Sequence, residues 1–344
     1  MGGTVRAMMP FELPIVPMEA KVRTSWPADG WAFEPKWDGF RAIAAGGPAR
    51  LDSRKQRPLL RYFPELADVV LSVPDGTAID GEVVVVDQDS LAFDMLQSRI
   101  HPAESRIAML SEQIPSTLVA FDLLADRGED LRERPFNERR ARLEDLMPLL
   151  DSRWRMTPST TDVDVAKRWF DEFEAAGCDG IVAKSLEGPY VEGKREMLKF
   201  KHRRSVDCVV GGYRVHKDGD RIGSLLLGLY AAGGSLAFIG HCSGFTNHDR
   251  VELLERFSVL KDTRSFGEDV RSPGGESRWS AGKDLSWVPV KPGVVIEISY
   301  DQLTADRFRH ATRFERWRPD KDPQDCTFAQ LELPEGPGFS SLFD

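Results

Sequence analysis

The sequence predicts an α+β protein of two domains, the first mixing helices with strands and the second mainly β. Two observations indicate this class. The chain has 344 residues, whereas one domain usually takes roughly 100–200. Its apolar runs also change in length and spacing at residues 203–206. With 41% hydrophobic and 29% charged residues the composition is that of a globular protein. We therefore expect domains at residues 1–204 and 205–344.

The first domain alternates apolar runs with helical patterns. Four runs have the length and composition of strands: residues 77–87, 117–124, 180–184 and 197–201. Residues 164–176 carry apolar side chains at positions i, i+3, i+4 and i+7, which form one face of a helix. Gly177 follows where a C-terminal cap belongs. Residues 136–150 predict a second, more highly charged helix, so this half mixes α and β.

The second half is organised differently. Three strands separated by tight turns come first, at residues 206–215, 223–230 and 236–241. A helix over residues 247–260 and a late strand over 294–300 follow. Strands, one helix and strands again within roughly 125 residues are typical of a small five-stranded barrel of the OB type. Residues 333–344 are rich in Pro and Gly, and we expect them to be frayed.

Composition excludes several classes of protein. No apolar run approaches the roughly 18 residues that a membrane helix needs. The first residues lack the pattern of a secretory signal. The four cysteines are scattered and form no CxxC pair, which indicates free thiols in a reduced compartment. These features predict a cytoplasmic protein.

The distribution of charge points to a polyanion. The net charge of −9 argues weakly against nucleic acid as a partner. Residues 199–204, however, hold four cations and no acid, and residues 307–321 hold six cations against two acids. Such patches are suited to binding a polyanion while the rest of the surface stays acidic.

The sharpest local feature is the segment 34–41, EPKWDGFR, which places four charged side chains around a glycine turn. Taken alone, it is better interpreted as a surface turn with paired charges. Four further segments combine charged residues with apolar strands: 80–82, 121–122, 179–184 and 198–201. In the last of these, Lys199 and Lys201 are two apart and share one face of a strand. A final charged segment, 318–321, ends the second basic patch.

This set resembles the nucleotidyltransferase superfamily of ATP-dependent DNA ligases and mRNA capping enzymes. The motifs match in order: KWDGFR (36–41), SRKQ (53–56), DGE (80–82), FD (121–122), DGIVAK (179–184), LKFK (198–201) and RPDK (318–321). The match spans about residues 31 to 323. The stretches 94–100 and 308–321 look like the compact bacterial stand-alone ATP-dependent DNA ligases, the LigC type.

The resemblance has two departures. Lys55 and Gln56 replace the Asn and Gly of the usual SRNG motif, and Met197 stands where a Trp is common. The resemblance implies a fold of two domains. The first is a mixed α/β adenylation domain of the nucleotidyltransferase kind, similar to an ATP-grasp domain, and the second is an OB-fold β-barrel.

The resemblance also implies ATP as the cofactor, with AMP carried covalently on Lys36. A free lysine has a pKa near 10.4, so it must be desolvated or placed near other cations before it can attack. Nearby lysines at 184, 199 and 201 would supply those cations. The implied metal, Mg²⁺ or Mn²⁺, would bind at Glu82 and Asp179, since Mg²⁺ prefers carboxylates together with water and phosphate oxygens.

The nucleotide contacts implied by the family involve ten residues: Glu34, Arg41, Arg54, Glu82, Phe121, Lys184, Lys199, Lys201, Arg318 and Lys321. Phe121 would stack on adenine, and Glu34 would accept from the adenine amino group. Arg41 and Arg54 suit ribose and phosphate because a guanidinium matches phosphate oxygens. Arg318 and Lys321 would contact the leaving pyrophosphate. The main positions also have plainer interpretations. Lys36 would be a surface lysine, the acids would be carboxylates at strand ends, Phe121 would be a core phenylalanine, and residues 307–318 would be a solvated basic strand.

The implied partner is nicked double-stranded DNA, contacted mostly through its phosphates, with other DNA repair proteins as further partners. We expect a monomer with no membrane contact, cytoplasmic and associated with the nucleoid. Two alternatives stay open at this stage. An RNA ligase or an mRNA capping guanylyltransferase shares the KxDG core, and a non-catalytic OB-fold protein would bind nucleic acid through a decayed transferase domain.

Overall fold

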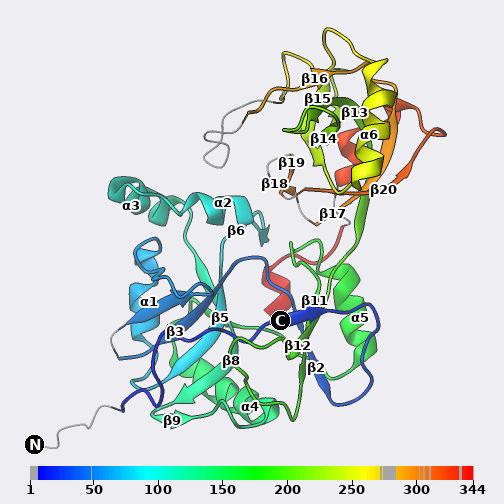
Figure 1. Cartoon of the computed structure of the whole chain (residues 1–344). Helices are drawn as coiled ribbons and strands as arrows, with labels where there is room; N and C mark the ends of the chain where they lie inside the picture. The colour runs from blue at the N-terminus through cyan, green and yellow to red at the C-terminus, as the bar shows by residue number, and fades with distance from the viewer. Residues whose placement is uncertain are drawn as a thin grey trace, which may run out of the picture. The chain divides into compact units, whose positions relative to one another are not determined.

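The computed structural model describes residues 7–47, 49–271, 273, 284–301, 303–304, 307–309, 311–332 and 335–343. By its internal contacts the chain divides into two compact units (Figure 1). The first unit comprises Met1–Lys201 and Leu333–Asp344, and the second comprises His202–Glu332. The division falls close to the expected boundary after residue 204, but the end of the chain groups with the first unit and not with the second.

The larger sheet of the first unit has six strands in the order β10-β8-β5-β3-β4, with β9 paired to β8. Its strands are β3 (Phe40–Ala45), β4 (Arg50–Ser53), β5 (Ala78–Val84), β8 (Thr117–Asp126), β9 (Glu129–Asp130) and β10 (Trp154–Met156). All pairings except that of β10 with β8 are antiparallel. The central strands β5 and β8 are almost entirely buried, and β8 is mostly apolar, whereas β5 carries Asp80 and Glu82 between its apolar residues.

The smaller sheet of this unit has four strands in the order β1-β12-β11-β2. They are β1 (Ala20–Val22), β2 (Trp31–Pro35), β11 (Ile181–Ser185) and β12 (Met197–Phe200). β11 runs antiparallel to both of its neighbours, and its register pairs Val182 with Glu34 on one side and with Lys199 on the other. Three motifs that are far apart in the sequence therefore lie side by side in one sheet.

Five α-helices belong to the described part of this unit. They are α1 (Ala67–Leu71), α2 (Phe93–Ser98), α3 (Glu104–Gln113), α4 (Phe136–Leu146) and α5 (Val163–Glu172). Single turns of 3-10 helix, η1 (Pro64–Leu66) and η2 (Met147–Leu149), adjoin α1 and α4. α4 packs on β8, and α5 packs on β2 and β11 (Figure 1). The expected helix over 164–176 is confirmed as α5, which begins after Asp162, whose side chain accepts hydrogen bonds from the amides of Asp164 and Val165.

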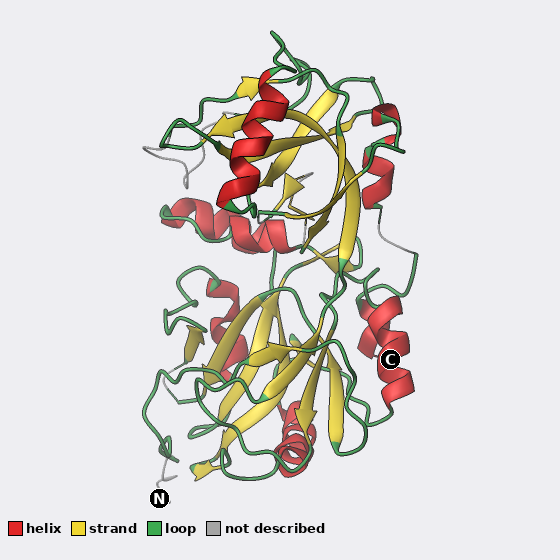
Figure 2. Ribbon diagram, turned by 45° about the vertical axis from the view of Figure 1, so that its right-hand side comes forward, coloured by secondary structure: helices red, strands yellow, loops and turns green. Residues whose placement is uncertain are grey.

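The second unit is a curved sheet around its own core (Figure 2). The strand order is β15-β14-β13-β17-β20, with β16 paired to β13. The bounds are β13 (Arg204–Val215), β14 (Ile222–Tyr230), β15 (Leu236–Cys242), β16 (Val288–Pro289), β17 (Val295–Tyr300) and β20 (Arg313–Trp317). A bridge joins Cys242 of the outer strand β15 to Thr312, the residue just before β20, as the closure of a barrel requires.

One helix and one small hairpin complete the second unit. The helix α6 (Asn247–Ser258) begins with a capping box in which Thr246 and Asp249 bond reciprocally. It buries Leu253 and Phe257, and its bounds lie within the predicted helix over residues 247–260. The hairpin consists of β18 (Leu303–Thr304) and β19 (Arg307–Phe308), and the short 3-10 helices η3 (Pro323–Asp325) and η4 (Phe328–Leu331) follow β20. The expected OB-type barrel is therefore confirmed.

The expectation that the C-terminal residues are frayed is wrong for the described part of that segment. Residues 340–343 form a 3-10 helix, η5 (Ser340–Phe343), beside the short hairpin of β6 (Val86–Asp87) and β7 (Ser90–Leu91). Phe339 and Leu342 are buried there. The Pro and Gly content suggested disorder, but three apolar side chains in five residues provide enough buried surface to fix the segment. No helix in the described part of the chain is long and apolar enough to cross a membrane.

Candidate active site

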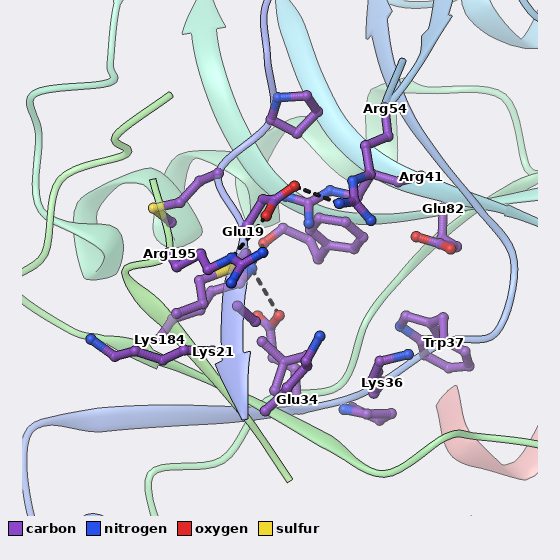
Figure 3. Close-up of a pocket in the computed structure, with 18 of the residues that line it drawn as sticks. Glu19, Lys21, Glu34, Lys36, Trp37, Arg41, Arg54, Glu82, Lys184 and Arg195 are labelled. Carbon is purple, nitrogen blue, oxygen red and sulfur yellow. Dashed lines mark hydrogen bonds and ion pairs between the residues drawn. The ribbon is translucent and has the colours of Figure 1, made fainter. Parts of the chain in front are cut away.

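A cleft of about 540 Å³ opens between the two sheets of the first unit (Figure 3). Its volume is in the usual range for small-molecule sites, roughly 300–1,000 Å³. The smaller sheet and the residues next to it line one side, and Arg41, Glu82 and Phe121 of the larger sheet line the other. Eight of the residues predicted from the sequence line the cleft: Glu34, Lys36, Arg41, Arg54, Glu82, Phe121, Lys184 and Lys199.

Lys36 follows directly after β2, and its backbone is fixed on both sides. Its amide donates to the carbonyl of Gly180 and its carbonyl accepts from the amide of Asp179, each at 2.8 Å. Gly180 has a φ of +123°, and a Cβ there would lie 1.9 Å from the carbonyl oxygen of Phe200. Only glycine fits this position. The glycine of the DGIVAK motif therefore aligns the loop after β2 with the start of β11.

Two lysines share one carboxylate, and of the three residues only Lys36 is among those that line the cleft. Lys36 Nζ lies 2.7 Å from Asp179 Oδ2, and Lys201 Nζ lies 2.8 Å from the same atom. The side chains of Lys36 and Asp179 are 22% and 8% exposed, so the pair is largely removed from water. The charges therefore attract more strongly than they would at the protein surface.

The electrostatics of Lys36 differ from the sequence-based expectation of cationic surroundings. Burial opposes its charge, but the carboxylates of Asp179, Glu82 and Asp38 outweigh that effect and raise the pKa of Lys36 above its usual value. The ammonium of Lys36 is thus held in an ion pair with Asp179. Lys199 shows the expected effect instead, since burial and the nearby Lys36 and Lys201 lower its pKa.

Glu82 stands on β5 opposite Arg41 of β3 and is partly buried. Burial raises its pKa to about 8, and Asp38 and Asp80 add to the shift, while Arg41 and Lys36 oppose it. A carboxyl with this pKa holds a proton at neutral pH unless a cation enters the cleft. Among the described residues no group of three or more His, Cys, Asp or Glu side chains could hold a metal ion.

Glu34 and Lys184 form a buried pair beneath the ring of Phe121. Lys184 Nζ lies 2.8 Å from Glu34 Oε2 and donates to the carbonyl oxygen of Phe121 at 2.6 Å. Arg140 contacts the other oxygen of Glu34 at 3.3 Å. Burial raises the pKa of Glu34 despite these two cations. Lys184 is only 3% exposed, so in this structure it supports Glu34 and Phe121 rather than pointing freely into the cleft.

The two arginines of the cleft are held differently. Arg41 forms a bidentate pair with Asp80 at 2.7 and 2.5 Å, and its guanidinium lies 4.8 Å from the centre of the Phe121 ring. Tyr190 donates to the same Asp80 at 2.6 Å. Arg54 is 65% exposed and pairs with Glu19 at 2.6 Å. Arg41 is thus a fixed part of the wall, whereas Arg54 stands at the rim.

Sequence reasoning missed several residues of the site. Glu19, Lys21 and Arg195 line the cleft, and Arg140 and Tyr190 support its charged residues. These residues lie outside the quoted motifs, so no local signal indicated them. Arg318 and Lys321 belong to the second unit, where Arg318 pairs with Asp207 at 2.8 Å and with Asp320 at 2.9 Å. Their part in the reaction stays a prediction.

Comparison with known proteins agrees with this geometry. Residues 17–201 match the model of the ATP dependent DNA ligase domain, and residues 218–321 match that of the ATP dependent DNA ligase C terminal region. The chain is 47% identical to DNA ligase C2 of Mycolicibacterium smegmatis over 342 residues, which are 95% of this chain and 96% of the relative. It is 46% identical to DNA ligase C of Mycobacterium tuberculosis over 346 residues, with the same coverage.

Solved structures show the same fold. A mycobacterial DNA ligase D complexed with ATP and MES covers 92% of this chain and 99% of its own, with a TM-score of 0.50 and 27% identity. A Lig E DNA ligase covers 88% of this chain and all of its own, with a TM-score of 0.57 and 16% identity.

An adenylation fold with a lysine in its cleft, joined to an OB-fold domain, defines a covalent nucleotidyltransferase. Within that class the chain belongs to the ATP-dependent DNA ligases, since both family models match in order and the relatives align over nearly their whole length. It is a DNA ligase that uses ATP. The alternatives of a capping enzyme, an RNA ligase and a non-catalytic binding protein are therefore set aside.

Proposed function

We propose that this ligase seals nicks in duplex DNA with Lys36 as its nucleophile. Lys36 Nζ attacks the α-phosphorus of ATP, a phosphoramidate bond forms and pyrophosphate leaves. The AMP then passes to the 5′-phosphate of a nick, and the 3′-hydroxyl displaces it. The observation that carries this role is the placement of Lys36 in the cleft with its backbone fixed to residues 179–180 and its amine beside Asp179.

The proton of Lys36 must leave before the amine can attack. In the structure the ammonium is held by Asp179, and Glu82 adds to that attraction. Triphosphate bound in the cleft would draw Lys199 and Lys201 toward its oxygens. The proton then passes to water, since the pKa of Asp179 is lowered by the two lysines and Glu82, with a pKa of about 8, already holds a proton at neutral pH.

We propose that the adenosine of ATP is bound by Phe121 and by the residues around its ring. The ring lines the cleft and is fixed by Arg41 and Lys184, each 4.8 Å from its centre, so its position is set before a base stacks on it. Glu34 lines the same part of the cleft and is suited to accept from the amino group of adenine. Such a contact favours ATP over GTP. Arg41 and Arg54 suit ribose and phosphate.

The donor set of the cleft fits a divalent cation such as Mg²⁺ or Mn²⁺. Glu82 offers a carboxylate, and Asp179 offers one that two lysines already share. Mg²⁺ usually takes one or two carboxylates together with phosphate oxygens and water, which agrees with a cleft that supplies few protein ligands. Such an ion would neutralise phosphate charge as pyrophosphate leaves.

We assign two roles to the second unit. Arg318 and Lys321 would contact the leaving pyrophosphate during adenylation, and the basic residues of 307–321 would contact DNA phosphates during sealing. Binding through phosphates is independent of sequence and weakens steeply with salt. We further infer a monomeric enzyme of DNA repair in the cytoplasm, associated with the nucleoid and working beside other repair proteins. Its support is the similarity to mycobacterial DNA ligase C.

The experiment that tests this function separates the first step from the last. Wild-type and Lys36→Ala proteins are incubated with α-labelled ATP or GTP and then with a nicked duplex, either plain or pre-adenylated at its 5′-phosphate. We expect wild type to take label from ATP only and to seal both nicks. Lys36→Ala should take no label and seal only the pre-adenylated nick. Label on Lys36→Ala, or failure of wild type to seal either nick, would refute the proposal.

A further inference from the structure

The last residues of the chain pack behind the loop that carries Lys36. Phe343 stacks on Trp37 with ring centres 5.5 Å apart and planes inclined by 6°, and Phe339 meets the same ring nearly edge-on at 5.8 Å and 70°. Trp37 is the residue after Lys36 and is itself buried. Figure 3 shows the red C-terminal ribbon beside Trp37. The chain thus leaves the first unit after Lys201 and returns to it at its end.

Backbone contacts fix this segment in place. The carbonyl of Asp89 accepts from the amide of Phe339 at 2.6 Å, and Asp89 Oδ1 accepts from the amide of Ser340 at 2.8 Å. The carboxylate therefore caps the first turn of η5. At Gly338 an added Cβ would lie 1.9 Å from Asp89 Oδ2, so a side chain there is incompatible with the observed approach. The segment is seated by specific contacts and not by apolar burial alone.

The same packing reaches three positions of the active site. Phe339 and Leu342 share a buried cluster with Trp37, Phe121 and Cys178. Trp37 follows Lys36, Phe121 lines the cleft, and Cys178 precedes Asp179. The segment therefore supports, from behind, the nucleophile, the predicted adenine platform and the carboxylate partner of the nucleophile.

We propose that residues 338–343 are a positioning element for adenylyl transfer. Stacked on Trp37, they hold the Lys36 loop in the geometry that attack on ATP requires. The proposal rests on the proposed role of Lys36. Without the segment the Trp37 ring loses both aromatic partners and keeps the hydrogen bond from Nε1 to Thr157 Oγ1 at 3.0 Å. A displacement of about 1 Å at a reacting group is enough to slow a reaction by about a hundredfold.

The test compares three variants with a matched control. One lacks residues 338–344, Phe343→Ala removes only the stacked ring, and Asp89→Ala removes the cap. The control, Glu335→Ala, changes an exposed side chain just before the segment. We expect the deletion to lower kcat for lysyl-AMP formation at least about tenfold and to change KM for ATP by less than about threefold. Phe343→Ala and Asp89→Ala should have smaller effects, and the control none.

Two further measurements distinguish positioning from general damage. Sealing of a pre-adenylated nick does not use the Lys36 amine, so the deletion should change it by less than about threefold. A peptide of residues 333–344 added in trans should restore adenylation to the deleted protein, and the same peptide with Phe343→Ala should restore less. Circular dichroism confirms that each variant is folded.

Three outcomes would overturn the proposal. The first is that the deleted protein takes up AMP at the wild-type rate. The second is that lysyl-AMP formation and sealing of a pre-adenylated nick fall equally. The third is that the peptide restores no adenylation to a folded, deleted protein. Failure of the proposed function gives a different result, because wild type itself would then carry AMP elsewhere than on Lys36 or carry none.

Discussion

Replacing Asp179 with asparagine removes a carboxylate that two lysines share and keeps its shape. Oδ2 of Asp179 lies 2.7 Å from Lys36 Nζ and 2.8 Å from Lys201 Nζ. Breaking a buried ion pair by removing one partner costs about 3–5 kcal/mol of stability. Asp179 is 8% exposed, whereas the lysines are 22% and 27% exposed and keep part of their hydration. We therefore expect Asp179→Asn to lower the free energy of unfolding by about 2–3 kcal/mol.

Urea unfolding of a double-mutant cycle measures this contribution directly. Asp179→Asn, Lys36→Met and the double variant are unfolded at pH 7, with the two units fitted as separate transitions. We expect an interaction energy of about 1–2 kcal/mol between the two positions, since Lys201 retains part of the attraction. The variant should also adenylate at lower pH than wild type, because the carboxylate that raises the pKa of Lys36 is gone. The reasoning would be refuted if the two substitutions changed the free energy of unfolding additively and Asp179→Asn alone lowered it by less than about 0.5 kcal/mol.

Three other perturbations have defined outcomes. The pKa of Glu82 is raised from 4.5 to about 8, so the folded state favours its protonated form and the free energy of unfolding falls as pH rises through that interval. Glu82→Gln should therefore be more stable than wild type at pH 9, with a difference that shrinks toward pH 4, and equal stability at both would contradict this. Phe121→Leu should raise KM for ATP about tenfold, since stacking of a base on an aromatic ring is worth about 1–3 kcal/mol, and an unchanged KM would count against adenine stacking. Arg318→Ala should lose adenylation and keep sealing of pre-adenylated nicks, and equal loss of both would contradict a role in pyrophosphate release.

The sequence was sufficient to predict the elements and motifs that depend on local pattern. The helix over 164–176 was predicted because its apolar face repeats at helical spacing, and it is present as α5. Strand alternation and turns likewise predicted β13 to β15. The cleft could be anticipated because seven motifs occur in a family order, and eight of the predicted residues line it.

Other features depend on tertiary contacts that no local pattern encodes. Arg140 reaches Glu34 across 106 positions of sequence, and Tyr190 reaches Asp80 across 110. The electrostatics of Lys36 were misjudged for the same reason. Its lysine neighbours were visible in the sequence, but only the fold shows that Asp179 lies nearer than they do to its amine and raises its pKa. The ordered C-terminal segment was missed because its seat is formed by Trp37 and Asp89.

The covalent role of Lys36 is tested most directly by locating the AMP that the enzyme carries. Protein incubated with ATP and Mg²⁺ is measured by intact mass, digested, and its peptides are fragmented to find the modified residue. We expect one AMP per chain, on the peptide that contains Lys36, and no added mass on Lys36→Ala. AMP attached to any other lysine, or retained by Lys36→Ala, would contradict it.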